Sequence, residues 1–176
     1  VPLFQNKSRY FVVTGGRGSS KSFTITLFLL QLTYEKGHKI LFSRYTLISA
    51  NASIIPEFIE KIDLMDVHKD FRITKDEIIN LTTGSSIMFK GIKTSSGNQT
   101  AALKSLSGVT TFVLDEAEEL TDEYTFSKID LSIRHQTMPN RVILILNPTT
   151  KEHWIFQRFF LMKNIKAGSN TQFEDT

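Results

Sequence analysis

The stretch GGRGSSKS, at residues 15–22, constrains what this chain can fold into more than any other feature. It lies between two apolar runs, RYFVVT before it and FTITLFLLQLTYEK after it. A buried strand, a glycine-rich loop and a helix in this order form a phosphate-binding loop, because backbone N–H groups and the amino end of the helix converge on an anion. Lys21 and Ser22 stand where such a loop neutralises phosphate charge and holds Mg²⁺. The stretch therefore predicts a nucleotide site, with a plain glycine-rich turn before a helix as the alternative.

The loop departs from the pattern G-x-x-x-x-G-K-[ST] at one position, where Ser20 replaces the second glycine. Glycine is usual there because a side chain would crowd the loop or the phosphate. Serine is the least bulky polar replacement and is acceptable near the start of a helix. We therefore expect the loop still to bind phosphate. The residues expected to contact the nucleotide are Gly15, Gly16, Arg17, Gly18, Ser19, Ser20, Lys21 and Ser22.

A second half of a nucleotide-hydrolysing site lies much further along the chain. The run TTFVLDE places Asp115 and Glu116 at the carboxyl end of an apolar strand. We expect Asp115 to hold Mg²⁺ together with Ser22, and Glu116 to orient and polarise the attacking water. The two half-motifs occur in the right order on the right elements, which favours ATP binding and hydrolysis. The acids that follow, Glu118 and Glu119, are interpreted as complementing the dipole of a helix.

Three further polar residues are candidates for this site. Arg17 contacts the γ-phosphate in its own chain or in a neighbouring subunit, unless it is a solvated loop arginine. Asn147, in LNPTT at the end of the last apolar strand, either senses the γ-phosphate or belongs to an ordinary Asn-Pro turn. Gln5, ahead of the first strand, is a candidate to recognise adenine.

Other cations are candidates for a finger that reaches the ATP of a neighbouring subunit. A surface charge is the alternative for each of them. These residues are Arg44, Lys104 and Arg134.

Apolar strands alternate with helices along the chain, which predicts an α/β fold with a mostly parallel central sheet and helices on both faces. Pro56 is expected to kink or split the second helix, and the polar stretch Lys93–Ser107 is expected to be a working loop. Expected strands are Arg9–Thr14, Lys39–Ser43, 108–116 and Arg141–Asn147, with a hairpin from Glu77–Asn80 and Ser86–Lys90. Expected helices are Phe23–Lys36, Leu47–Ile62, Thr121–Arg134 and Lys151–Leu161.

The composition further limits which kinds of protein and site this chain can form. With 40% hydrophobic residues over 176 positions, the chain can form one domain with a sizeable core. It contains no cysteine, which excludes disulfides and thiolate chemistry, and its four histidines show no metal-ligand spacing. We expect no signal peptide and no membrane span. The net charge of +3 is small, although residues 1–50 carry seven Lys and Arg against one acid and could meet phosphate.

Several runs in combination resemble the ATPase domain of the large terminase subunit of tailed bacteriophages, particularly the branch related to the defective prophage PBSX. The runs are RYFVV followed by GGRGSSKS, then FKGI, LKSLSGVTTFVLDEAEEL and LNPTTKEHWIFQRFF. The resemblance implies a RecA-like P-loop NTPase that binds ATP and Mg²⁺. It implies that Arg17 is the catalytic arginine of the phosphate loop, that Asp115 and Glu116 are the metal-associated and catalytic acids, and that Asn147 with Thr149 couples hydrolysis to movement.

The resemblance also implies partners and a setting. Such proteins drive double-stranded viral DNA into a procapsid, as a homo-oligomeric ring on the portal protein, together with a small terminase subunit. The implied location is the cytoplasm of the infected bacterial host, and an isolated domain is expected to be a monomer. The family carries a second, nuclease domain that cuts DNA concatemers. We expect residues 1–176 to be one ATPase domain, with residues after about 163 leading toward a nuclease domain absent from this chain.

Other classes of protein share parts of this pattern. A helicase-like ATPase would share both half-motifs but needs a second RecA-like lobe, and a small kinase should carry an arginine-rich lid. A nucleotide-gated scaffold without turnover would have no use for the acid Glu116. These alternatives remain open at the level of sequence.

Overall fold

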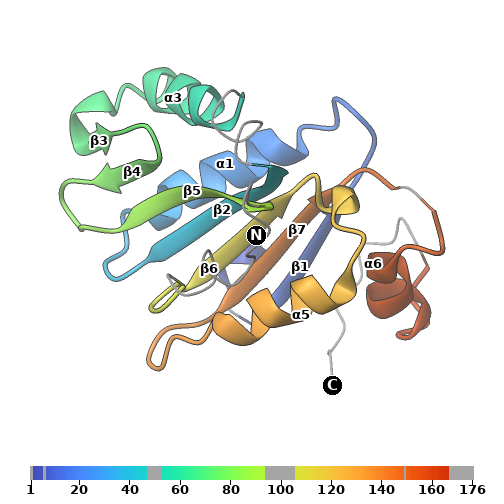
Figure 1. Ribbon diagram of the computed structural model, residues 1–176. Helices are drawn as coiled ribbons and strands as arrows, with labels where there is room; N and C mark the ends of the chain where they lie inside the picture. The colour runs from blue at the N-terminus through green and yellow to red at the C-terminus, as the bar shows by residue number, and fades with distance from the viewer. Residues whose placement is uncertain (1, 6, 47–52, 94–105, 149, 167–176) are drawn as a thin grey trace.

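The computed structural model describes residues 2–5, 7–46, 53–93, 106–148 and 150–166. Within these ranges, seven strands form one sheet in the order β1-β7-β6-β2-β5-β4-β3 (Figure 1). The strands are β1 (Tyr10–Thr14), β2 (Lys39–Thr46), β3 (Phe71–Ile73), β4 (Glu77–Asn80), β5 (Ser86–Lys93), β6 (Thr111–Asp115) and β7 (Arg141–Leu146). The first five strands in this order, β1, β7, β6, β2 and β5, pair in parallel. Strands β4 and β3 continue the sheet in antiparallel pairing. The predicted α/β fold with a mostly parallel sheet is confirmed.

Helices cover both faces of this sheet. They are α1 (Lys21–Leu32), α3 (Ile55–Leu64), α5 (Glu123–Ser132) and α6 (Trp154–Phe156), which continues as the π-helical turn η5 (Gln157–Leu161). Short 3₁₀ turns lie at η1 (Pro2–Phe4), η3 (His68–Asp70) and η4 (Ala117–Glu119). In Figure 1, α1 lies behind the sheet and α5 lies in front of it.

Side chains along the central strands point alternately to the two faces of the sheet, which divides the core into two layers. Val113 and Ile143 belong to a buried cluster with the side chains of α1 and α3. Their neighbours Phe112 and Val142 belong to a second buried cluster with α5 and α6. Because successive side chains of a strand point to opposite faces, a central strand covered on both faces must be apolar at every position. This requirement explains the continuous apolar runs of β6 and β7.

Several elements differ from the sequence-based expectation. Helix α1 ends at Leu32 rather than Lys36, and strands β2 and β5 are longer than expected. Pro56 lies in the first turn of α3, where a missing N–H costs nothing, and α3 continues from there to Leu64. The predicted kink or split at Pro56 stays a prediction, because most of the chain expected to be helical ahead of it lies outside the described residues. Strand β3 was not expected, because three residues are too short for an alternating pattern to be visible. The last helix begins at Trp154 rather than Lys151, with the His153 side chain accepting a hydrogen bond from the N–H of Ile155. Residues 47–52 of the predicted second helix and 94–105 of the predicted loop lie outside the described residues.

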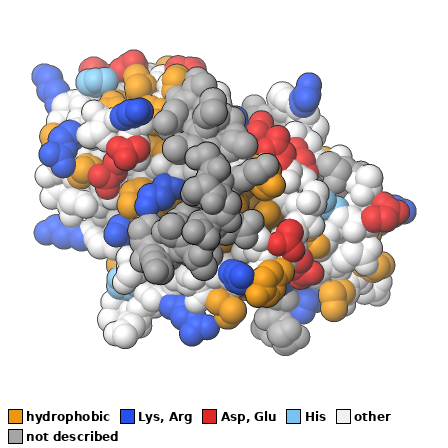
Figure 2. Space-filling model, viewed as in Figure 1, with side chains coloured by type: hydrophobic (Ala, Val, Ile, Leu, Met, Phe, Trp, Pro, Cys, Tyr) orange, Lys and Arg blue, Asp and Glu red, His pale blue; other side chains and the backbone are white. Residues whose placement is uncertain are grey.

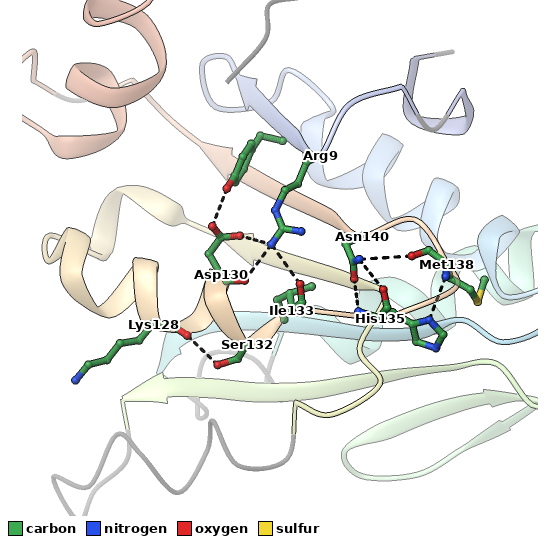
Figure 3. Close-up of polar contacts among 9 residues, drawn as sticks. Arg9, Lys128, Asp130, Ser132, Ile133, His135, Met138 and Asn140 are labelled. Carbon is green, nitrogen blue, oxygen red and sulfur yellow. Dashed lines mark hydrogen bonds and ion pairs between the residues drawn. The ribbon is translucent and has the colours of Figure 1, made fainter. Parts of the chain in front are cut away.

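A polar cluster fastens α5 to the start of β1 (Figure 3). Arg9 Nη2 donates to Asp130 Oδ1 at 2.7 Å and to the carbonyl of Ile133 at 3.2 Å, while the Tyr10 hydroxyl donates to Asp130 Oδ2 at 2.6 Å. Asp130 is buried, and a buried carboxylate needs such partners. This cluster lies at the amino end of β1, away from the glycine-rich loop.

The surface has a mixed character. On the face shown in Figure 2, acidic and basic side chains are interspersed, and exposed hydrophobic side chains are scattered. No helix among the described residues is both long enough and apolar enough to cross a membrane.

Candidate nucleotide-binding site

The glycine-rich loop connects the carboxyl end of β1 to the amino end of α1, as predicted. Gly18 has φ of +74° and Ser20, which immediately precedes α1, has φ of +58°. Both values lie in the left-handed region, which costs a residue with a side chain about 1–2 kcal/mol and glycine almost nothing. The position where the sequence departs from the phosphate-loop pattern is therefore one whose backbone favours glycine. Ser20 tolerates it, and its carbonyl still accepts the hydrogen bond of the Thr24 N–H at 3.0 Å.

Lys21 turns back over the loop that precedes it. Its Nζ donates to the carbonyls of Gly15 and Gly16 at 2.7 and 2.9 Å, and to Asn147 Oδ1 at 3.1 Å. Ser19 Oγ lies 3.3 Å from the same nitrogen. The ammonium group thus sits in a ring of oxygens, and these contacts join the loop after β1 to the end of β7.

The two acids emerge at the end of β6, which is separated from β1 by β7 alone. Asp115 is buried, and Glu116 adopts a left-handed backbone conformation with φ of +54° that turns the chain sharply out of the strand. Burial raises the pKa of the Glu116 carboxyl, the neighbouring acids, Asp115 foremost, add to the rise, and Arg44 opposes it. A carboxyl with a raised pKa accepts a proton more readily, as a general base must.

Arg44, on β2, contacts this acid pair within its own chain. Its Nε and Nη2 donate to Asp115 Oδ2 at 2.9 and 2.6 Å, and Nε lies 3.6 Å from Glu116 Oε2. Its Nη1 donates to Ser53 Oγ at 2.8 Å, ahead of α3. From the sequence, Arg44 was a candidate finger for the ATP of a neighbouring subunit. Its ion pair with Asp115 was not predicted, because it depends on the pairing of β2 with β6.

Asn147 joins the loop to a further acid. While its Oδ1 accepts from Lys21, its Nδ2 donates to Glu118 Oε1 at 3.0 Å. The other carboxylate oxygen of Glu118 is buried and has no hydrogen-bond partner. The sequence pattern suggested only a helix-dipole role for Glu118, yet the structure places it in the wall of the site.

These groups line one hollow of about 400 Å³ at the carboxyl ends of β1, β7 and β6. Its lining residues are Arg17, Gly18, Lys21, Ser22, Arg44, Asp115, Glu116, Glu118, Glu119, Ile145, Leu146 and Asn147. The two half-motifs, far apart in the sequence, therefore meet in space. An opening of this size, lined by the cations Arg17, Lys21 and Arg44 and by carboxylates, suits a polyanion that arrives with a divalent metal.

A model of the family described as phage terminase large subunit matches residues 7–175. The chain belongs to the phage terminase large subunit family. The large terminase subunit of Bacillus phage SPP1 is 25% identical over 179 residues, which cover 94% of this chain and 41% of that protein. The chain thus spans about two fifths of the length of this curated relative.

Solved structures from this group of proteins share the fold. The N-terminal domain of the DNA packaging ATPase from bacteriophage phi29 matches with a TM-score of 0.72 and 14% identity, over 99% of this chain and 90% of that one. A large terminase from a thermophilic bacteriophage, in complex with ADP, matches with a TM-score of 0.66 and 11% identity, over 92% of this chain and 40% of that one. At these identities the likeness concerns the fold, the RecA-like fold of terminase ATPase domains, which confirms the predicted fold class.

Not every candidate residue named from the sequence reaches the hollow. Gln5 is exposed beside η1 and is not among the lining residues. Arg134 is exposed and directly follows Ile133, whose carbonyl contacts Arg9 at the amino end of β1. Arg134 therefore lies near the amino ends of the strands, whereas the hollow lies at their carboxyl ends. Thr149 and Lys104 lie outside the described residues.

The run LNPTTKEHW contains two residues that contact the backbone of the segment after β6, at η4 and at Leu120. His153 Nε2 lies 3.1 Å from the Glu118 carbonyl, and the buried Trp154 donates its indole N–H to the carbonyl of Leu120. Neither contact with the loop after β6 was predicted from the sequence.

The donor set at the hollow fits Mg²⁺. Asp115, Glu116 and the hydroxyl of Ser22 are hard oxygen donors that line the same space. Among the described residues, no group of three or more His, Asp or Glu side chains forms a metal site by itself. A site that binds Mg²⁺ together with a nucleotide does not need one, because phosphate oxygens and water can complete the shell of the metal.

Proposed function

We propose that this chain is the ATP-hydrolysing motor domain of a phage DNA-packaging terminase, which uses ATP and Mg²⁺ to drive double-stranded viral DNA into the procapsid. One observation carries the proposal, namely that Lys21, at the start of α1, and the pair Asp115 and Glu116, at the end of β6, line the same hollow. The family membership and the likeness to a packaging ATPase support it. A protein that only bound nucleotide would have no use for an acid at Glu116.

In this proposal each side of the hollow has its own task. The loop from Gly15 to Ser22 cradles the phosphates with its backbone N–H groups. Lys21 exchanges the carbonyls of Gly15 and Gly16 for phosphate oxygens, since a cation gains more from a full negative charge than from neutral carbonyls. Ser22 and Asp115 hold Mg²⁺, which neutralises charge on the phosphates.

Glu116 acts as the general base that orients the attacking water and takes a proton from it. Its raised pKa, caused first by burial, brings the carboxyl closer to the range of a general base at neutral pH. Arg17, exposed at the rim of the hollow, stabilises charge on the γ-phosphate in the same chain or in a neighbouring one.

Asn147 with Thr149 transmits the state of the nucleotide to the rest of the domain. The hydrogen bonds of Asn147 to both Lys21 and Glu118 support this role, because any movement of Lys21 alters the first of them. Glu118 is in turn tied through its backbone to His153, ahead of α6. A signal at the phosphates thereby has a route to the C-terminal helix.

The assembled motor is proposed to be a homo-oligomeric ring on the portal protein, working with a small terminase subunit in the cytoplasm of the infected host. Alone, the domain is proposed to be a monomer that hydrolyses ATP slowly, because the trans finger is supplied by a neighbouring subunit only in the ring. Adenine recognition by Gln5 stays a proposal, as does a nuclease domain in the rest of the protein, reached through residues after about 163.

The test is ATP turnover by the purified chain with Glu116 changed to Gln. We expect turnover to fall by at least about 100-fold, because proton transfer to the carboxylate is lost. Binding of a fluorescent ATP analogue should stay within about threefold of the parent, since one general base contributes to the transition state rather than to ground-state binding. Glu152→Gln, an exposed acid outside the hollow, is the matched control and should change neither.

Two results would contradict the proposal. Turnover of the Glu116→Gln variant at the parent rate would remove the assignment of the catalytic acid. Absence of nucleotide binding by the parent chain would remove the site itself.

A further inference from the structure

The pairing of β2 with β6 places Arg44 directly against Asp115, the acid proposed to hold Mg²⁺. In the parallel pairing of β2 with β6, Ser43 lies opposite Leu114, so the next residue along each strand, Arg44 and Asp115, also lie side by side. The contact is close, with Nη2 at 2.6 Å and Nε at 2.9 Å from the same oxygen, Asp115 Oδ2. Both side chains are nearly enclosed, at 14% and 4% exposure. The ion pair is a built part of the site rather than a surface contact.

The other cations of the hollow are engaged elsewhere or are at its edge. Lys21 is held by the loop carbonyls and by Asn147, and Arg17 is exposed. In the described part of the chain, Arg44 is therefore the cation in contact with Asp115. A carboxylate as enclosed as Asp115 is unfavourable without a counter-charge. Arg44 supplies that charge while the site holds no metal.

We propose that Arg44 is the internal counter-ion of Asp115 and Glu116, and that it yields Asp115 Oδ2 when a metal nucleotide binds. This inference rests on the proposed function, since it concerns the same metal-associated acid. Arg44 and a divalent cation carry the same sign of charge and compete for one carboxylate oxygen. Arg44 therefore opposes binding of the metal, and it favours binding of the metal-free nucleotide, whose charge is negative.

The contact with Ser53 gives the exchange a structural consequence. Arg44 Nη1 donates to Ser53 Oγ at 2.8 Å, just ahead of α3. When Arg44 leaves Asp115, it stays attached on this side, so the guanidinium remains near the site rather than in solvent. The residue thereby links occupancy by metal to the start of the helix that follows β2.

The decisive test measures equilibrium binding, so it does not depend on turnover. Affinity for fluorescent ADP is titrated in EDTA and at rising Mg²⁺ with the parent and with Arg44→Gln, which removes the charge but keeps a polar side chain. We expect Arg44→Gln to bind metal-free ADP about tenfold more weakly and to gain about tenfold more from saturating Mg²⁺ than the parent does, because one positive charge is removed close to both ligands. Binding of Mn²⁺ alone, followed by electron paramagnetic resonance, should become tighter in the same variant.

Two further variants keep the test interpretable. Arg44→Lys retains the charge and should keep the Mg²⁺ dependence close to that of the parent, even if Arg44→Gln folds poorly. Arg72→Gln removes an exposed arginine on β3, at the far edge of the sheet, and should behave as the parent.

The opposite outcomes are distinct. If Arg44 only orients Asp115 for the metal, Arg44→Gln will reduce the gain from Mg²⁺ and weaken Mn²⁺ binding, which overturns the proposal. An unchanged Mg²⁺ dependence in Arg44→Gln overturns it as well. Either result leaves the proposed function intact as long as the parent binds Mg²⁺ and ADP and Glu116→Gln abolishes turnover. Absence of nucleotide binding by the parent would instead end both proposals.

Discussion

Replacing Ser20 by glycine tests whether the serine of the phosphate loop is strained. Ser20 has φ of +58°, and its side chain caps no N–H of α1, so glycine removes the backbone strain without losing a cap. The left-handed conformation costs a residue with a side chain about 1–2 kcal/mol. Glycine loses more conformational entropy on folding, which offsets about 0.5–1 kcal/mol of that gain. We therefore expect Ser20→Gly to raise the free energy of unfolding by about 0.5–1 kcal/mol.

The assay is urea denaturation, followed by circular dichroism and repeated as a thermal scan. For a chain of this size the expected gain corresponds to a rise in Tm of about 1–4 °C. Gly18→Ala is the opposing control. Gly18 has φ of +74° and a methyl group there would meet no atom within 4 Å, so its cost of about 1 kcal/mol would come from the backbone alone. A loss of stability in Ser20→Gly, with Gly18→Ala behaving as expected, would refute this account of the loop.

Two further predictions concern parts of the fold outside the loop. Asp130→Ala should lower the free energy of unfolding by about 2–3 kcal/mol, because it leaves Arg9 and the Tyr10 hydroxyl without their shared carboxylate. Tyr10→Phe should lower it by only about 1 kcal/mol in the same denaturation assay. Equal losses in the two variants would argue against a shared cluster. Burial lowers the pKa of His38 in the folded protein, so the unfolded chain takes up the proton first and stability should fall as pH drops from about 7 through the unfolded value of about 6.5. Denaturation at several pH values should show this slope in the parent and a weaker one in His38→Gln, and an identical slope would contradict it. The groups that face His38 are Glu35, Arg141, His135 and the hydroxyl of Thr110.

Much of the fold could be predicted because its signals are local. The apolar runs of β1, β6 and β7 are continuous, which required a sheet covered on both faces, and the glycine-rich run fixed the connection to α1. Strand β3 has three residues, and the end of α1 at Leu32 depends on how the next residues fold, so neither had a clear signal. In each case the missing information lay in tertiary contacts.

The same division holds at the site. Residues that act through position within a motif, such as Lys21 and Asp115, could be named from the sequence and lie in one hollow. Arg44 and Glu118 act through partners on other strands, and sequence spacing does not reveal which side chain faces which across a sheet. Arg44 was one of several scattered cations until the register of β2 against β6 set it beside Asp115.

The central claim is that Lys21 and the acids at the end of β6 act on one triphosphate. A structure of this chain with Mg²⁺ and a non-hydrolysable ATP analogue tests it most directly. We expect the γ-phosphate to lie within hydrogen-bond distance of Lys21 Nζ and the metal to lie between that phosphate and Asp115, with the contacts of Lys21 to Gly15 and Gly16 released. A nucleotide bound elsewhere, or one whose phosphates leave Lys21 on its loop carbonyls, would contradict the account.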